Sequence, residues 1–439
     1  MSRVAGGGLL RRHRDFRLLW CGETAGKFGA SVTGVAMPLV AVSTLHAGTF
    51  AVALLSAATW APWLLIGLPA GVWVDRLPRR PVMLAAAAVS VVLFAALPVA
   101  AWCGGLSIGL LLAVALLTGT AAVFFQTAYS AYLPTVVAPD DQAEGNAKLH
   151  GSASAAQIAG LGSGGLIVQV AGAVNAMFAN AGTFLVSLVC LAGIRHREPP
   201  PAAGVRPRSL AGEVGEGLRL IAGDSWLRTL TLFGAASNLA LMGYQSIQVV
   251  FLVRDVGLAP GTVGALIAAT SAGGVAGALT ARRVAGRIGS ARATLLFELG
   301  LAVPAVLIPL TGGGAGVLLF VTGGFCVAAG VVAGNIIKAG FQQRYCPPEL
   351  LGRLTASAAF LGYGTLPLGA LLGGALGTAL GLRTAMAVTA AGVPLAAAIL
   401  LFSPVRRSRD LPAYRRGTAD AAGRPDRAHV PDAPAPGGE

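Results

Sequence analysis

The sequence predicts an all-α membrane protein in which twelve helices cross the bilayer as two pseudo-symmetric bundles of six. Hydrophobic residues make up 55% of the 439 residues and charged residues only 11%, and the mean hydropathy is +0.72. A soluble protein of this size needs far more charge to cover its surface. Long apolar runs fill the chain, and each approaches the roughly 20 residues that cross about 30 Å of hydrocarbon.

The predicted spans follow one another with short polar loops between them. The 61 glycines suit helices that pack closely in lipid through small residues. We place the spans at 18–44, 51–74, 81–103, 106–131, 146–170, 173–194, 226–253, 261–281, 291–311, 315–337, 354–379 and 383–403.

Lysine and arginine residues lie almost entirely on one side of these spans. They occur in the N-terminal tail, in every second loop and in the C-terminal tail, whereas the opposite side has only Arg254 and Arg383. Cytoplasmic loops carry this excess, so we expect both termini in the cytoplasm. The first apolar run is too long for a cleavable signal segment, and we interpret it as a span. The net charge of +14 is therefore a topology signal, since no basic stretch is interleaved with aromatics as in nucleic-acid binding.

The chain divides into two halves around a polar stretch. We expect a first bundle at 1–194, a cytoplasmic linker at 195–225, a second bundle at 226–403 and a disordered cytoplasmic tail at 404–439. Residues 209–221 of the linker follow the pattern of an amphipathic helix, which we expect on the cytoplasmic membrane surface.

The two halves repeat each other at a constant offset of 209 positions. The offset relates Gln126 to Asn335 and Tyr129 to Lys338. It also relates three glycines of the fifth span to three of the eleventh: Gly160, Gly164 and Gly165 to Gly369, Gly373 and Gly374. Two parallel six-helix repeats of this kind are a common plan of membrane transporters.

The loop after the second span places one acid among three arginines. It reads Gly71-Val-Trp-Val-Asp75-Arg76-Leu-Pro-Arg79-Arg80. Ion pairs in such a loop are expected to latch the two halves in one conformation and to break in the other. The alternative interpretation is that the arginines only anchor the topology and that Asp75 is a surface carboxylate.

The chain resembles the major facilitator superfamily over all of its spans, and within it the bacterial branch of siderophore exporters and macrolide-efflux permeases. The loop is similar to the signature G-x3-D-R-x-G-R-R, with Pro78 in place of a glycine. Gly160, Gly164 and Gly165 are similar to the antiporter signature G-P-x-x-G-G, with Leu161 in place of its proline. These glycines suit a sliding helix seam, or ordinary tight packing. Span 4 lacks the arginine of many drug/proton antiporters, a departure that concerns the coupling mechanism.

Glu23 and Lys27 are four residues apart, so they share one face of the first span. A lone charge at this depth costs several kcal/mol, so the two side chains should pair or face a wet cavity. Our hypothesis is that Glu23 exchanges protons during transport and that Lys27 is its partner. The alternative is a static ion pair.

By the resemblance, spans 1, 4, 7 and 10 line a central cavity. The candidate residues on the last three are Gln126, Tyr129, Asn238, Tyr244, Gln245, Gln248, Asn335 and Lys338. Lys338 has a second interpretation, in which it extends to the membrane surface. Glu298 falls in span 9, which is peripheral by the resemblance, and we expect it to pair with an arginine of the basic side.

The predicted function is secondary active transport, as proton-coupled efflux of an amphipathic drug, macrolide or siderophore-like metabolite across a bacterial cytoplasmic membrane. An importer of a small solute and a non-transporting receptor on the same fold stay open as alternatives. The five histidines lie outside the span interiors and the five cysteines are scattered, which argues against an enzyme, a metal site or a disulfide framework. There is no Walker-type loop, so we expect neither ATP nor another cofactor to act.

Overall fold

A computed structural model describes residues 9–138, 141–196 and 210–413, and these residues form helices and no strands. Ten helices are long and apolar enough to cross a membrane, and two shorter apolar helices, Thr49–Leu65 and Ala176–Ala192, lie between them in the chain. The predicted all-α class is confirmed.

In the first half of the chain (residues 9–196), α2 is the central helix and packs against both α7 and α8. Around this trio, α5 packs on α8, α6 on α5, and α3 on α6. The helices are α1 (Leu9–Arg12), α2 (Arg14–Leu39), α3 (Thr49–Leu65), α4 (Gly67–Arg76), α5 (Arg79–Trp102), α6 (Ile108–Val136), α7 (Gln142–Ala171) and α8 (Ala176–Ala192).

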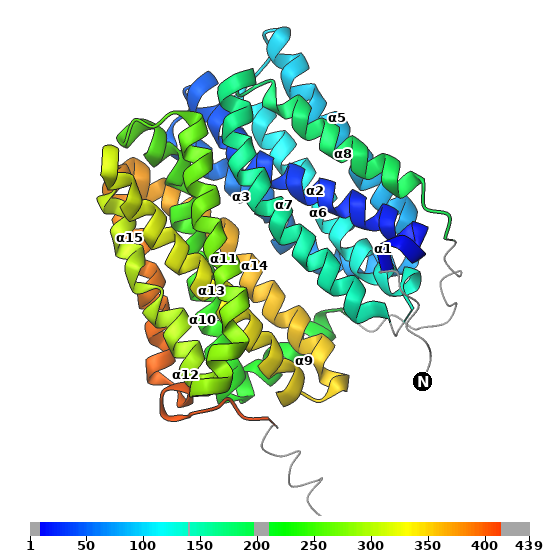
Figure 1. Ribbon diagram of the computed structural model, residues 1–439, viewed down its shortest axis with the longest axis vertical. Helices are drawn as coiled ribbons and strands as arrows, with labels where there is room; N and C mark the ends of the chain where they lie inside the picture. The colour runs from blue at the N-terminus through cyan, green and yellow to red at the C-terminus, as the bar shows by residue number, and fades with distance from the viewer. Residues whose placement is uncertain (1–8, 139–140, 197–209, 414–439) are drawn as a thin grey trace, which may run out of the picture.

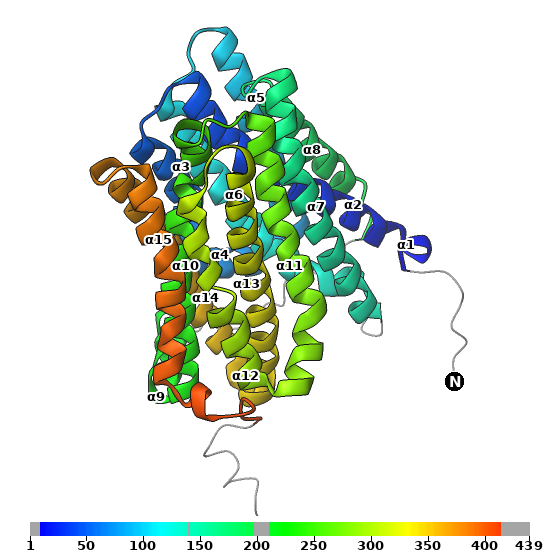
Figure 2. The same cartoon turned by 60° about the vertical axis from the view of Figure 1, so that its left-hand side comes forward.

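In the second half (residues 210–413), α10 takes the place of α2 and packs against α14 and α15, while α11 packs on α13. The helices are α9 (Leu210–Gly223), α10 (Ser225–Val250), α11 (Pro260–Ile288), α12 (Ser290–Leu295), the π-helical turn Leu296–Gly300, the 3-10 helix Val303–Leu310, α13 (Val317–Tyr345), α14 (Pro348–Ala379) and α15 (Leu382–Ala397). Both α2 and α10 end in a five-residue π-helical turn, at Val40–Thr44 and Phe251–Asp255. Figure 1 shows the two halves as separate groups of helices, and Figure 2 shows α10, α11 and α13 running side by side.

The second predicted span is broken in the structure. Instead of one helix over 51–74 there are α3 and α4, with Ile66 between them at φ −124° and ψ −1°. Pro69 explains the break, because its ring clashes with the carbonyl group four residues earlier and it has no N–H to donate. The residue that would receive that bond is Leu65, where α3 ends.

The halves meet along two pairs of helices, α7 with α11 and α3 with α14. We call the end of the molecule that carries Arg14 and Arg79 the basic end, and the opposite end the far end. Most contacts between the halves lie toward the far end, where Arg254 donates a hydrogen bond to the carbonyl oxygen of Ala47 at 2.8 Å. From there the two groups of helices diverge toward the end at which α1 lies (Figure 1).

The repeated glycines occupy equivalent positions in the two halves. Gly160 of α7 packs against the backbone of α2 at Phe28, and Gly369 of α14 packs against the backbone of α10 at Leu239. The last of the three pairs reaches across to the other half: Gly165 contacts α11 at Gly264. Its counterpart on α14 contacts α3, and this symmetry of contacts is the structural expression of the sequence repeat.

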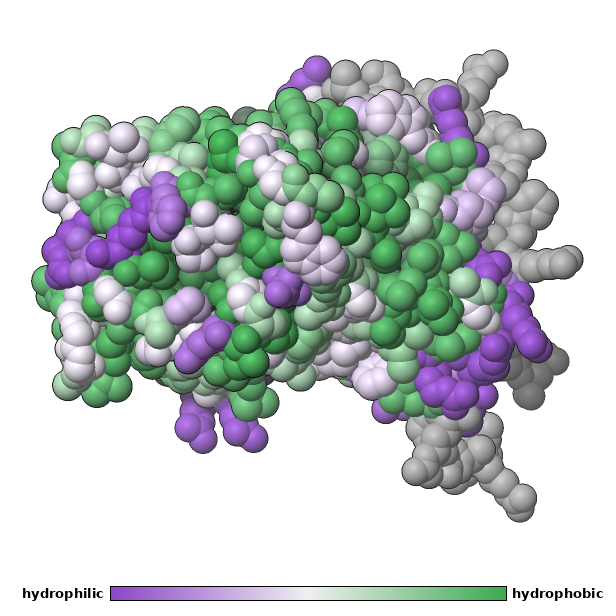
Figure 3. Space-filling view, turned by 90° about the horizontal axis from the view of Figure 1, so that it is seen from above, coloured by the Kyte–Doolittle hydropathy of each residue, from purple (hydrophilic) through white to green (hydrophobic). Residues whose placement is uncertain are grey.

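The outer surface is rich in exposed hydrophobic side chains. Examples are Leu232 (55% exposed), Leu279 (69%) and Leu395 (70%), each on a different helix. Seen from above, the surface is mostly hydrophobic, with hydrophilic residues in separate patches (Figure 3). A soluble protein rarely exposes apolar side chains on this scale, so the helix sides that carry these leucines suit a lipid bilayer.

The linker helix α9 packs on the second half. Gly217 fits against Arg353 and Ser357 of α14, and Glu216 forms an ion pair with Arg353. These contacts attach α9 to α14, in addition to any contact with the membrane surface. The earlier linker residues 197–209 lie outside the described residues.

The segment after the last span differs from the predicted disordered tail in its first residues. Pro404–Arg407 forms a 3-10 helix, and Val405 and Leu411 are buried at 0% and 6% exposure. Two apolar side chains therefore order residues 404–413, which composition alone did not indicate. Residues 414–439 of the predicted tail lie outside the described residues.

Candidate functional site

A charged cluster lies within the first half, near the middle of α2. The ammonium of Lys27 is 3.4 Å from the carboxylate of Glu23 and donates a hydrogen bond to Oε1 of Gln126 at 3.2 Å. Tyr129 lies one turn further along α6 and interacts electrostatically with the carboxylate of Glu23. The four polar residues predicted on spans 1 and 4 are therefore neighbours.

The two charges of this cluster differ in exposure. Glu23 is 7% exposed, whereas the side chain of Lys27 is 42% exposed. A carboxylate removed from water needs a nearby cation, and Lys27 supplies it from the next turn of the same helix. The cluster thus has a buried acid and a partner that retains contact with an open space.

A polar cavity of about 380 Å³ lies in the second half between α10, α13 and α14. It contains three of the predicted residues, Asn238, Asn335 and Lys338. The amide nitrogen of Asn238 donates to the carbonyl oxygen of Gly362 at 3.1 Å, which fixes its side chain. Sequence reasoning missed two other lining residues, Gln342 and Tyr363, although Gln342 lies one turn beyond Lys338 on the same helix face.

The expected partner of Glu298 was wrong. Glu298 is 9% exposed. The cation that interacts electrostatically with its carboxylate is Lys338 rather than an arginine of the basic side. Its carboxylate lies against Gly334 of α13, in space that a Cβ at that position would occupy. The signal in the sequence was the four-residue spacing of Gly334 and Lys338, which places both on one helix face.

The three remaining candidates on α10 do not line the cavity. Tyr244 is 6% exposed and belongs to the hydrophobic core toward the far end, Gln248 is half-buried, and the side chain of Gln245 is exposed. They lie further along α10 than Asn238, toward the far end.

The predicted latch loop joins α4 to α5. Arg80 donates to the carbonyl oxygens of Leu191 (3.3 Å) and Ala192 (2.7 Å) at the C-terminal end of α8. A cation there satisfies backbone acceptors that a helix end leaves free. These partners belong to the first half. Gly71 is half-buried, Arg76 is exposed and Arg79 is half-buried. The side chain of Asp75 lies outside the described residues.

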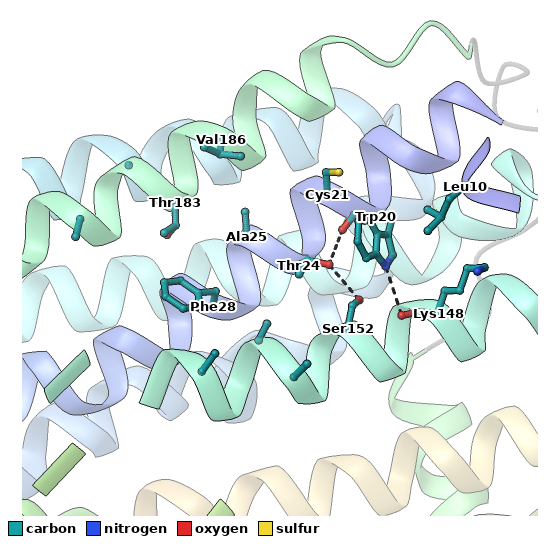
Figure 4. Close-up of a pocket in the computed structure, with 15 residues that line it drawn as sticks. Leu10, Trp20, Cys21, Thr24, Ala25, Phe28, Lys148, Ser152, Thr183 and Val186 are labelled. Carbon is teal, nitrogen blue, oxygen red and sulfur yellow. Dashed lines mark hydrogen bonds between the residues drawn. The ribbon is translucent and has the colours of Figure 1, made fainter. Parts of the chain in front are cut away.

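A larger cavity of about 1030 Å³ opens beside the charged cluster, on another face of α2. Figure 4 shows it between α2, α7 and α8, where the hydroxyl of Thr24 donates to Ser152 at 3.1 Å and the indole of Trp20 to the carbonyl of Lys148 at 3.4 Å. Small residues of α7 such as Ala155 leave the space open. None of the predicted cavity residues lines it.

No metal centre is apparent in the part of the chain that the structure describes, where three or more His, Cys, Asp or Glu side chains never gather. The five cysteines are free.

The paired helical halves agree with the comparison with known families. The profile described as Major Facilitator Superfamily matches residues 19–365. The chain belongs to the Major Facilitator Superfamily. The family resemblance inferred from the loop after span 2 is thereby confirmed, and the chain is a multi-pass membrane protein.

Curated relatives support this membership. The chain is 30% identical over 408 residues to the multidrug efflux pump Tap of Mycolicibacterium fortuitum, covering 90% of this chain and 96% of that protein. It is 29% identical over 370 residues to the protein of the same name from Mycobacterium tuberculosis, covering 82% and 86%. Efflux transport is thus the activity that the named relatives share.

Solved structures show the same fold. The nucleoside transporter NupG, as a mutant, aligns with a TM-score of 0.72 at 11% identity, over 88% of this chain and 99% of that one. A bacterial homologue of the iron transporter ferroportin in an inward-facing state aligns with a TM-score of 0.71 at 17% identity, over 90% and 99%. At these identities the likeness concerns the fold of this superfamily member and not its substrate.

Proposed function

We propose that this superfamily member is a proton-coupled exporter of amphipathic small molecules, such as drugs, macrolides or siderophore-like metabolites. The observation that carries the proposal is the buried carboxylate of Glu23, paired with Lys27 at 3.4 Å inside a helix that crosses the membrane. The efflux activity named for the relatives at 29–30% identity supports the direction of transport.

The proposed topology has twelve spans, with α3 and α4 acting together as the second. The basic end lies in the cytoplasm, because the loops on that side carry nearly all of the lysine and arginine residues. The membrane is the cytoplasmic membrane of a bacterium. In this orientation the structure corresponds to a state closed on the outer side, and a substrate enters from the cytoplasm.

In the proposed cycle, Glu23 accepts a proton from the outer side and releases it to the cytoplasm. Protonation removes the carboxylate charge, so Lys27 loses its ionic partner and keeps Gln126. Deprotonation restores the ion pair. The difference in pairing gives the two conformations different free energies, which is what coupling requires. The electrical part of the proton gradient supplies about 2.3 kcal/mol per charge per 100 mV.

The seam glycines and the latch loop belong to the movement between the two conformations. Gly165 lets α7 and α11 approach closely at the far end, and the loop from Gly71 to Arg80 is proposed to stabilise one arrangement of the basic end. Export then requires that the two halves rock against each other, so that access alternates between the two sides of the membrane.

The test is proton movement in acid-loaded proteoliposomes that contain the full chain. Erythromycin, as a macrolide, and desferrioxamine, as a siderophore, are added to wild type, Glu23→Gln and the surface control Glu216→Gln. We expect substrate-dependent proton release in wild type and in the control, and its loss in Glu23→Gln. Retained release in Glu23→Gln would assign coupling to another group.

A parallel flux measurement decides the direction. Labelled erythromycin should leave the cytoplasmic side of wild-type vesicles when the proton gradient is imposed. Movement in the same direction as the protons would identify an importer instead. Absence of movement for every compound, with the folded protein present, would favour a receptor on this fold.

A further inference from the structure

The side chain of Lys338 lies between two different environments. On one side it lines the 380 Å³ cavity with Asn238 and Asn335. On the other side the carboxylate of Glu298 lies against Gly334, one turn earlier on the same helix. Its ammonium nitrogen also approaches α10, at 3.6 Å from the position of a Cβ on Gly234. One cation therefore stands between a buried acid and an open polar space.

The backbone makes room for the acid behind Lys338. Glu298 lies in the π-helical turn Leu296–Gly300, which turns a side chain away from the direction of a regular helix and is frequent at functional sites. The carboxylate fills the space that the missing side chain of Gly334 leaves. The carboxylate of Glu298 thus lies outside the cavity, on the side of Lys338 that faces away from it.

The described residues that line the cavity carry a positive charge and no negative one. Lys338 is the one ionisable cation among its described lining residues, which include no carboxylate. The other polar groups are the amides of Asn238, Asn335 and Gln342 and hydroxyls of α10 and α14. An ammonium and amide N–H groups favour an oxyanion as ligand.

The aromatic wall beside this polar floor suits the apolar part of a ligand. Tyr363 lines the cavity and stacks with Trp60 at 6.0 Å between ring centroids, and it contacts Trp63 at 5.0 Å. These rings come from both halves of the chain, so a ligand held there touches the helices whose movement transport requires. Flat aromatic or apolar bodies pack well on such surfaces.

We propose that this cavity binds the carboxylate of an amphipathic organic acid, and that Lys338 is the counter-ion shared between that carboxylate and Glu298. The inference rests on the transport function proposed above for the ligand's passage across the membrane, and binding itself is tested separately. In the empty cavity Glu298 is the acid behind Lys338, since its carboxylate lies at Gly334, one helical turn from Lys338 on α13. A bound carboxylate takes part of the charge of Lys338, and Glu298 competes with it.

Competition predicts opposite effects for the two partners. Lys338→Met removes the cation and should abolish preference for an acid over its neutral amide. Glu298→Gln removes the competitor and should strengthen acid binding. Lys338→Arg keeps a charge and should keep the preference. A purely structural ion pair would make Lys338→Met and Glu298→Gln equally harmful and would leave the preference unchanged.

The probes are naphthylacetate and naphthylacetamide, which share an aromatic body and differ in charge at neutral pH. Titration calorimetry of the purified full chain in detergent gives both affinities. We expect wild type to bind the acid at least about tenfold more tightly than the amide, as charged hydrogen bonds require. The ratio should fall to about one in Lys338→Met and rise in Glu298→Gln, while Lys148→Met matches wild type.

Lys338→Met leaves Glu298 without its cation, and a buried unpaired charge is destabilising. The double variant Lys338→Met/Glu298→Gln removes both charges and keeps the test valid if the single variant unfolds. An acid-to-amide ratio that stays at the wild-type value in the double variant would overturn the proposal, as would equal binding of the two probes by wild type. Such a result would leave proton-coupled efflux by way of Glu23 intact. Loss of drug-driven proton release with the preference for the acid intact would instead contradict proton-coupled efflux and leave the carboxylate site standing.

Discussion

Gly165 of α7 lies directly against Gly264 of α11, so that a Cβ added at Gly165 would stand 2.7 Å from the Cα of Gly264. This is contact between two backbones, and each comes from a different half of the chain. On the symmetric side of the molecule, a Cβ at Gly374 of α14 would lie 2.5 Å from the Cβ of Ala53 on α3. The closed far end therefore depends on the absence of side chains at paired positions.

Replacement of Gly165 by valine should open the far end. The added side chain would clash with backbone atoms of α11. The clash is relieved only if α7 and α11 separate, so we expect the closed arrangement to lose about 1–3 kcal/mol of stability. The reactivity of a cysteine placed at Ala53, which is buried at 0% exposure, measures this opening. We expect severalfold faster labelling in Gly165→Val.

Gly160 supplies the matched control on the same helix. A Cβ there would lie 2.7 Å from the Cβ of Ser31 on α2, within the first half. Gly160→Val should lower the melting temperature without faster labelling at Ala53. If both variants label alike, the seam between the halves has no special part in closure.

A disulfide across the far end should hold the protein in the closed arrangement. The Cβ of Thr49 lies 3.8 Å from the position of a Cβ on Gly377. This separation is the mean for disulfides, at about 3.8 Å. We expect Thr49→Cys/Gly377→Cys to cross-link on mild oxidation and to lose transport, and a reductant should restore it.

Each single cysteine variant serves as the control, because neither has a partner at this distance. Transport that continues at the wild-type rate in the fully cross-linked double variant would mean that α3 and α14 do not separate during the cycle. The proposal of alternating access between these halves would then fail.

Asp410 attaches the segment after the last span to the start of α12. Its carboxylate accepts hydrogen bonds from the backbone N–H of Ser290 at 2.8 Å and from the Ser290 hydroxyl at 3.2 Å. The Ser290 N–H is the main cause that holds the pKa of Asp410 below its usual range. Because the ionised form is favoured in the folded state, the attachment is complete above the ordinary pKa of aspartate and is lost as the pH falls through the lowered value.

Hydrogen exchange at the Leu411 amide, which donates to the Ser290 hydroxyl at 2.8 Å, reports on this attachment. Asp410→Ala should exchange severalfold faster than wild type at neutral pH. Once the intrinsic rates are corrected for pH, the two proteins should converge in acid below the lowered pKa. A constant ratio at every pH would show that the carboxylate charge is not the cause.

The sequence by itself determined the solvent and the helical class, because hydropathy and charge act on each segment separately. The Glu23–Lys27 pair was predictable for the same reason, since a spacing of four residues places two side chains on one face of a helix. The repeat offset likewise related Lys338 of the second half to Tyr129 of the first, and Lys338 lines the polar cavity of the second half.

Only the tertiary structure decided which distant residues meet. Glu298 and Lys338 come from different helices, and the position of Glu298 one turn from Lys338 depends on a π-helical turn and on the space at Gly334, neither of which hydropathy reports. Tyr244 has the polar aromatic side chain expected of a cavity residue. It lies in the core instead, because the rotation and depth of α10 follow from packing with α14 and α15. Local sequence specifies the character of each helix face, whereas the partner of that face is set by long-range packing that no single segment encodes.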